Sequence, residues 1–171
     1  MNTMDPRLPK QWTASGFVLH PERKVLLIHH RKLGVWLYPG GHIESTESPD
    51  DAVLREISEE TGIQARILGL LDTPLADPEA DVHVLHTPYR VLCERINDPK
   101  GHHYHIDLIY LCVALETNCI ANGEVHAARF FSQEELADLK LFPNFRVLLR
   151  RVFEDEEIWR AMDKLKEQVA A

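Results

Sequence analysis

Three glutamates, Glu56, Glu59 and Glu60, stand at the i, i+3 and i+4 spacing that places side chains on one face of a helix. Like charges on one helix face cost stability unless something neutralises them, so the plainest interpretation is a solvated acidic face. Here a Gly-Gly loop precedes the helix, and Arg55 is available to hold a neighbouring carboxylate. Clustered carboxylates with backbone carbonyls nearby supply the oxygen ligands that Mg²⁺ and Mn²⁺ prefer. The spacing therefore indicates a site for a hard divalent cation.

The flanking residues predict that this helix runs over about residues 49–61. Ser48 is a natural N-cap, Pro49 suits the first helical position, and Asp51 stands where a capping box has its acidic partner. Gly62 supplies a residue that readily adopts the left-handed conformation after the last turn. Val53, Leu54 and Ile57 form an adjoining apolar stripe that would pack the helix on a core.

The stretch from Gly41 to Ile63 resembles the signature of the Nudix hydrolase family. That signature has seven specified Gly, Glu and Arg positions over 23 residues, a pattern far more specific than a short glycine motif. The resemblance covers this motif in detail and extends more loosely to the flanking strands and to residues 124–136. The matching positions are Gly41, Glu47, Arg55, Glu56, Glu59, Glu60 and Gly62.

The resemblance implies hydrolysis of a diphosphate linkage in a nucleoside diphosphate joined to another group, with Mg²⁺ or Mn²⁺ as cofactor. A bound cation would neutralise the diphosphate and lower the pKa of the attacking water. Arg55 would orient a carboxylate, while Glu47 and Gly62 would be structural. The metal ligands implied by the family are the Gly41 carbonyl and the carboxylates of Glu56, Glu59 and Glu60.

One further carboxylate, Glu124, lies six residues before Phe130 in the segment Glu-Val-His-Ala-Ala-Arg-Phe-Phe-Ser. In the type enzyme of the Nudix family, a metal-binding or basic Glu precedes an aromatic-x-Ser at a similar offset. Phe stands here in place of the usual Trp. Glu124 is therefore either a solvated turn residue or a residue that binds a second cation or acts as general base.

Several other side chains are candidates for substrate binding. His103, His105 and Asp107 alternate on a strand and share one face, so they either bind a transition metal, line the substrate cleft or hydrogen-bond within the sheet. Arg31 and Trp36 flank the Gly-Gly loop. Arg31 is suited to grip a phosphate, and Trp36 would either stack on a base or fill the core.

The composition is that of a soluble globular protein. Its 171 residues are 44% hydrophobic and 27% charged, and they point to one domain with a loose lead-in at residues 1–10. A formal net charge of −8 argues against an extended nucleic-acid partner. Cys93, Cys112 and Cys119 lack metal-ligand pairing, which favours a reduced, cytoplasmic setting. The sequence shows no secretory signal and no apolar run long enough for a membrane.

The predicted elements give an α+β fold, an α/β/α sandwich in which, by the family resemblance, a mixed sheet lies between helices. The signature forms a loop-helix-loop, and a short helix and a long C-terminal helix follow the strands. Strands are expected over residues 11–19, 24–30, 35–38, 64–71, 89–96, 102–115 and 125–131, and helices over 49–61, 133–139 and 143–168.

The sequence leaves other functions open. A catalytically idle sensor that binds nucleotides would have the same fold, but no signature carboxylate is lost here. An isomerase of isoprenoid diphosphates would need a Cys and Glu pair in the cleft, and no Cys lies near the motif. The group attached to the diphosphate depends on loops outside the motif, for which residues 72–88 and 97–103 are the candidates. A homodimer is plausible from the family.

Overall fold

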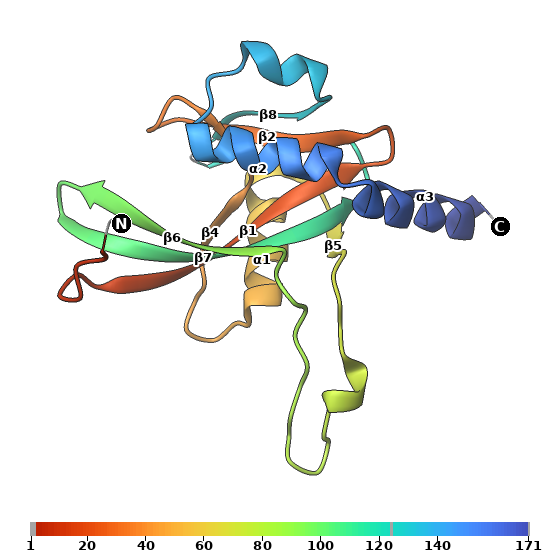
Figure 1. Ribbon diagram of the computed structural model, residues 1–171, viewed down its shortest axis with the longest axis horizontal. Helices are drawn as coiled ribbons and strands as arrows, with labels where there is room; N and C mark the ends of the chain where they lie inside the picture. The colour runs from red at the N-terminus through yellow and green to blue at the C-terminus, as the bar shows by residue number, and fades with distance from the viewer. Residues whose placement is uncertain (1–2, 124, 171) are drawn as a thin grey trace.

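A mixed sheet with helices on both faces forms the protein, as shown by a computed structural model that describes residues 3–123 and 125–170 (Figure 1). This is the α+β class that the sequence predicts. The helices are α1 (Pro49–Thr61), α2 (Pro143–Glu154) and α3 (Glu156–Ala170), with 3-10 turns at Thr73–Leu75 and Glu134–Asp138. The strands are β1 (Lys10–His20), β2 (Lys24–His30), β3 (Trp36–Leu37), β4 (Gly40–His42), β5 (Ala65–Ile67), β6 (Arg90–Asp98), β7 (Gly101–Ala114) and β8 (Val125–Phe131).

Strand β1 is the centre of the sheet, whose main order is β3-β2-β1-β7-β5. It runs parallel to β7, with Thr13 opposite Asp107, and the other strand pairs are antiparallel. On its other edge β1 pairs first with β4, through residues 13–15, and then with β2, through residues 18–20. Two different strands, β4 and β2, therefore share this edge of β1, and β4 contains the first residues of the signature stretch.

Short strand β4 forms where the Gly-Gly sequence predicts a loop. It forms because glycine lets two backbones approach closely: a Cβ on Gly40 would lie 2.7 Å from the carbonyl oxygen of Ala14. The expected strand at residues 64–71 is also shorter, since only Ala65–Ile67 pairs with β7. The remaining strands agree with the sequence to within a few residues.

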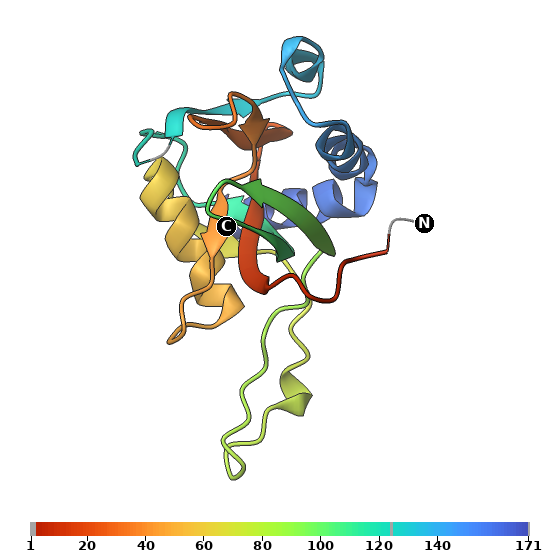
Figure 2. The same ribbon diagram turned by 90° about the vertical axis from the view of Figure 1, so that its left-hand side faces the viewer.

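Helix α1 covers one face of the sheet and helices α2 and α3 cover the other (Figure 2), and a hydrophobic core fills each face. On one face, α1 packs Val53 and Ile57 against Ala14 and Val18 of β1. On the other face, α2 and α3 cover a second set of apolar side chains. This larger core includes Phe17, Leu27, Ile109, Phe131, Leu149 and Trp159. The alternation of β1 residues between the two cores explains why its run from Thr13 to Leu19 is buried throughout.

Helix α1 begins and ends where the sequence predicts. The Ser48 side chain accepts a hydrogen bond from the Asp51 backbone N–H, and Asp51 completes the capping box. Gly62 closes the helix with φ 69°, and its N–H donates to the Ser58 carbonyl. These contacts fix where the helix begins and ends, and the packing of Val53 and Ile57 on the core leaves the acidic face turned away from that core.

The expected single helix over residues 143–168 is wrong, because the chain breaks between α2 and α3 at Asp155. Asp155 has extended backbone angles, and its carboxylate accepts from the Glu157 N–H. Acidic side chains suit the start of a helix and oppose its end, so the run at residues 154–157 ends one helix and begins the next. The buried Trp159 indole, which donates to the Val152 carbonyl, holds the two helices together.

Two further segments contain neither a regular α-helix nor a strand. The expected helix over residues 133–139 is a 3-10 turn at Glu134–Asp138, in which Glu135 accepts from the Ser132 N–H. Residues 68–89 form a long loop that projects from the body of the protein (Figures 1 and 2). Among the described residues, no helix is long and apolar enough to cross a membrane.

Candidate active site

The acidic face of α1 lies against strand β4, which brings the signature glycines and glutamates together. The Gly40 backbone N–H donates to Glu60 Oε2 over 3.0 Å. A Cβ on Gly41 would come within 2.4 Å of Glu56 Oε1, so this glycine leaves the space that the carboxylate occupies. Strand β4 thus contacts two of the three glutamates through its own backbone.

Arg55 organises the rest of the site through its planar guanidinium. Its Nε and one terminal nitrogen bind both carboxylate oxygens of Glu47, over 3.0 and 2.6 Å. The other terminal nitrogen bridges Glu56 Oε1 and Glu59 Oε2, over 2.9 and 3.0 Å. A further bond reaches the His42 carbonyl. One guanidinium therefore contacts three carboxylates and offsets part of the like charge that the helix spacing brings together.

The electrostatics of these carboxylates differ. Burial raises the pKa of Glu56, and the hydrogen bond and charge of Arg55 oppose that rise. The hydrogen bonds of Arg55 and of the Glu44 N–H lower the pKa of Glu47. Arg55 itself is held charged, since its bond to Glu47 raises its pKa. Glu47 is thus held ionised as the partner of Arg55.

The donor set of this site suits a hard cation. Carboxylates of Glu56, Glu59 and Glu60 and the backbone of Gly41 offer oxygen ligands, which Mg²⁺ and Mn²⁺ prefer. Within the described ranges, however, no three His, Cys, Asp or Glu side chains are grouped as they would be around a metal ion. Arg55 holds Glu56 and Glu59 through one oxygen each, and a carboxylate has a second oxygen to offer.

Glu124, the further carboxylate predicted from the sequence, lies outside the described residues. Arg31 is exposed in the turn after β2. Trp36 packs against the larger core, with its ring 4.8 Å from that of Phe131 and 5.2 Å from that of His29. Core packing is therefore the interpretation of Trp36 that the contacts favour.

Asp107 is almost fully buried, at 3% exposure, and it hydrogen-bonds within the sheet. Its Oδ1 accepts from the hydroxyls of Thr13 and Ser15, both over 2.9 Å, and its Oδ2 accepts from Tyr38 over 2.8 Å. Burial raises the pKa of Asp107, and these three bonds oppose the rise. Of the interpretations left open for this residue, the hydrogen-bonded one agrees with these contacts.

The predicted histidines form a row with His42 of β4. His103 Nε2 and His105 Nε2 are 3.1 Å apart, and the rings of His105 and His42 are 4.9 Å apart. His42 in turn contacts Gln11 over 2.8 Å. Burial, together with the charges of His42 and His103, lowers the pKa of His105 to about 4. The row therefore links β7 to the residue that follows the signature Gly41.

Sequence reasoning missed Thr13, Ser15 and Tyr38 as partners of Asp107. Tyr38 directly precedes Pro39-Gly40, so its bond to Asp107 ties the signature loop to β7. The polar alternation of Thr13 and Ser15 on an otherwise apolar strand was the available signal. It required knowledge that β1 and β7 are in register, which the sequence does not give.

Both a protein family and individual known proteins are similar to this chain. The profile of the family described as NUDIX domain matches residues 9–152. The chain is 38% identical over 101 residues to a probable DHNTP pyrophosphohydrolase of Lactococcus lactis, a match that covers 59% of this chain and 52% of that protein. It is 27% identical over 146 residues to the ADP-ribose pyrophosphatase of Methanocaldococcus jannaschii, covering 84% of this chain and 71% of that protein.

A solved structure resembles the fold over most of this chain. The crystal structure of a NUDIX family hydrolase from Clostridium perfringens matches with a TM-score of 0.72 and 27% identity, covering 92% of this chain and 99% of that one. Among the curated relatives, the chain spans 52% of the Lactococcus protein and 62% of a putative 8-oxo-dGTP diphosphatase 3 of Mycobacterium tuberculosis.

Proposed function

Because this chain belongs to the NUDIX domain family, we propose that it hydrolyses a diphosphate linkage in a nucleotide-type substrate. In this reaction water attacks one phosphorus of the diphosphate, and the bond from that phosphorus to the bridging oxygen breaks. Two phosphate products leave, and the proton of the water passes to a basic group. The substrate class is a nucleoside diphosphate joined to a further group.

The observation that carries this proposal is the arrangement of α1 around Arg55. This single guanidinium holds Glu47, Glu56 and Glu59, while Glu60 is held by the Gly40 N–H. Such fixed carboxylates next to a glycine backbone are suited to a cation that accompanies a diphosphate. We propose that Glu56, Glu59, Glu60 and the Gly41 carbonyl hold Mg²⁺ or Mn²⁺.

A bound divalent cation would supply charge neutralisation for the diphosphate and a lowered pKa for the attacking water. The protein's own residues must then accept the proton and fix the carboxylates. Arg55 and Glu47 would act by positioning, because they contact the other carboxylates and each other.

The names of the relatives support the substrate class. They include a probable DHNTP pyrophosphohydrolase, a putative 8-oxo-dGTP diphosphatase and an ADP-ribose pyrophosphatase. All three names describe cleavage of a phosphate chain attached to a heterocyclic compound. We therefore place nucleoside triphosphates and ADP-ribose first among the compounds to be tested.

The test is product release from a panel of these compounds, with Mg²⁺ and with a chelator in its place. Wild type should turn over at least one compound, and only with the metal. Glu60→Gln should lower turnover by about 10²-fold or more, because it removes a charged ligand. Glu154→Gln, the same substitution at an exposed position of α2, should match wild type. Nucleotide binding without turnover would contradict the proposal and favour a nucleotide sensor.

Glu124 stays a predicted cation ligand or general base. We expect Glu124→Gln to lower turnover and to change its dependence on pH, since a group that carries a proton would be lost. Turnover equal to wild type from acid to alkaline pH would exclude that role. The cytoplasmic setting, the single domain and the homodimer likewise stay predictions from the sequence.

A further inference from the structure

His103 and His105 of β7 meet through their ring nitrogens. Side chains two positions apart on a strand share one face of the sheet. Here the two Nε2 atoms are 3.1 Å apart, and the ring centroids are 4.9 Å apart. Both residues are only partly buried, so solvent and small ions can reach them. Paired imidazole nitrogens are a chelating group for ions such as Zn²⁺ and Ni²⁺.

The hydrogen bonds of His103 determine which of its nitrogens is free to bind an ion. Its Nδ1 lies 3.0 Å from the Gly101 carbonyl oxygen. A carbonyl only accepts hydrogen bonds, so Nδ1 carries the proton and Nε2 keeps its lone pair. His105 then donates its Nε2–H to that lone pair. Histidines that bind metals commonly donate the other ring N–H to a backbone carbonyl or a carboxylate. His103 therefore already has the tautomer of a metal ligand.

The distance between the two Nε2 atoms also suits a shared ion. A Zn–N bond measures about 2.0–2.1 Å. Two nitrogens on one ion are therefore about 2.9 Å apart when their bonds form a right angle, and about 3.3 Å apart in a tetrahedron. The observed 3.1 Å lies between these values. Because the χ2 torsion of histidine is broad, small ring rotations can direct both lone pairs at one ion.

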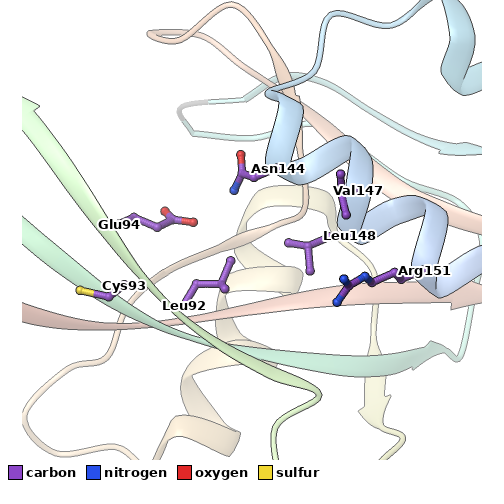
Figure 3. Close-up of a pocket in the computed structure, with 7 residues that line it drawn as sticks. All are labelled: Leu92, Cys93, Glu94, Asn144, Val147, Leu148 and Arg151. Carbon is purple, nitrogen blue, oxygen red and sulfur yellow. The ribbon is translucent and has the colours of Figure 1, made fainter. Parts of the chain in front are cut away.

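The neighbours of the pair leave it a nitrogen site. Glu94 of β6 is directly opposite His105, but its side chain is directed toward Asn144 of α2 (Figure 3). On the other side of β7, Gln11 of β1 is opposite His105, and its side-chain oxygen contacts His42 over 2.8 Å. Imidazole suits Zn²⁺, Ni²⁺ and Cu²⁺, whereas Mg²⁺ and Mn²⁺ prefer oxygen. The pair therefore favours a different class of ion from the carboxylates of α1.

Strand β4 separates the pair from those carboxylates. Gly41 faces the carboxylate of Glu56. Successive residues of a strand point to opposite faces, and the ring of the next residue, His42, lies 4.9 Å from that of His105. The oxygen ligands and the paired imidazoles thus lie on opposite sides of one short strand.

We propose that His103 and His105 together bind one late first-row transition ion, such as Zn²⁺ or Ni²⁺, at a site separate from the acidic face of α1. Each ring supplies its Nε2 atom, and the proton of His105 moves through solvent to Nδ1, so both rings stay neutral. Water fills the remaining positions, since within residues 3–123 and 125–170 no three His, Cys, Asp or Glu side chains are grouped around a metal site. The inference is independent of the proposed hydrolysis.

The experiment is calorimetric titration with Ni²⁺ of protein without a polyhistidine tag. Excess Mg²⁺ is present to occupy the oxygen ligands of α1, and every protein carries Cys93→Ser to remove an exposed thiol. The otherwise unchanged protein should bind one Ni²⁺ at this site. His103→Gln and His105→Gln should each bind it at least about tenfold more weakly, because even an outer partner of a metal ligand contributes about 10- to 100-fold to affinity. His102→Gln, at an exposed position of the same strand, is the matched control and should bind Ni²⁺ with unchanged affinity.

A second measurement needs no histidine variant and so does not depend on whether the variants fold. When Zn²⁺ is added to the wild-type protein, the imidazole nitrogen resonances of His103 and His105 should shift together in NMR spectra, while those of His102 stay in place. Absence of such shifts would overturn the inference. Equal Ni²⁺ affinity in the control and in the His103 and His105 variants would overturn it too, because the ion would then be bound elsewhere.

Discussion

Arg55 makes hydrogen bonds to Glu47, Glu56, Glu59 and the His42 carbonyl, so a single residue determines how the site is held. A lysine keeps the charge but cannot bind several acceptors in one plane. We expect Arg55→Lys to lower the free energy of unfolding by about 1–2 kcal/mol and turnover by at least about tenfold. Urea unfolding and turnover measure the two effects.

A matched control is Arg23→Lys, which changes an exposed pair with Glu156 over 3.1 Å. Both side chains of that pair are exposed to solvent, so its replacement should leave the free energy of unfolding essentially unchanged. If Arg55→Lys lost no more stability and turnover than Arg23→Lys, the planar guanidinium of Arg55 would not be what holds the carboxylates.

The lowered pKa of His105 predicts how the free energy of unfolding changes with pH. Its pKa is lowered to about 4 in the folded protein, whereas an unfolded histidine binds a proton near pH 6.5. Between these values the unfolded state holds more protons, so the free energy of unfolding falls as the pH falls from about 6.5 toward 4. His105→Gln lacks this contribution. Between pH 7 and pH 5, the free energy of unfolding of this variant should fall by about 1–2 kcal/mol less than that of wild type, a range that allows for the partial exposure of the His105 ring.

Denaturant unfolding at the two pH values measures this difference, and His102→Gln, at an exposed position of the same strand, is the control. The control should lose as much stability on acidification as wild type. An equal loss in His105→Gln would show that burial and the charges of His42 and His103 do not resist protonation of this ring.

Strand β4 allows its two glycines to be compared. A Cβ on Gly41 would meet the Glu56 carboxylate at 2.4 Å, the flexible end of a side chain. A Cβ on Gly40 would meet backbone atoms of Ala14 and Ser15 at 2.7 Å. Gly41→Ala should therefore lower turnover by about tenfold or more with little loss of stability. Gly40→Ala should destabilise the fold by about 1–3 kcal/mol, because the strands must separate.

Thermal unfolding and turnover of the two alanine variants, measured side by side, check this expectation. Full turnover in Gly41→Ala would mean that the position of Glu56 against β4 is unimportant. Unchanged stability in Gly40→Ala would mean that β1 and β4 adapt without cost.

The elements also show which parts of the fold are readable from sequence. Helix α1 is predicted from end to end, because its cap residues Ser48, Asp51 and Gly62 act on their immediate neighbours. The break between α2 and α3 was missed, since apolar spacing continues across it while the acidic run at 154–157 carries the signal. Strand β4 was missed because its pairing depends on β1, which is distant in sequence.

At the scale of the whole molecule, the candidate site depends on contacts that no local pattern reveals. Thr13 and Ser15 lie 94 and 92 residues from the Asp107 that they bind. The signature could be read from the sequence because its chemistry lies on one helix and one loop. The hydrogen-bonded cluster around Asp107 could not, because its members come from separate strands.

The proposed hydrolysis requires the acidic face of α1 to bind a divalent cation. Binding of Mn²⁺, followed by electron paramagnetic resonance without any substrate, tests it most directly. We compare wild type with a variant that carries both Glu56→Gln and Glu60→Gln, and with Glu154→Gln as control. Wild type and the control should bind Mn²⁺ alike, and the double variant should bind it at least about tenfold more weakly. Equal Mn²⁺ binding by all three proteins would show that the acidic face of α1 is not the cation site.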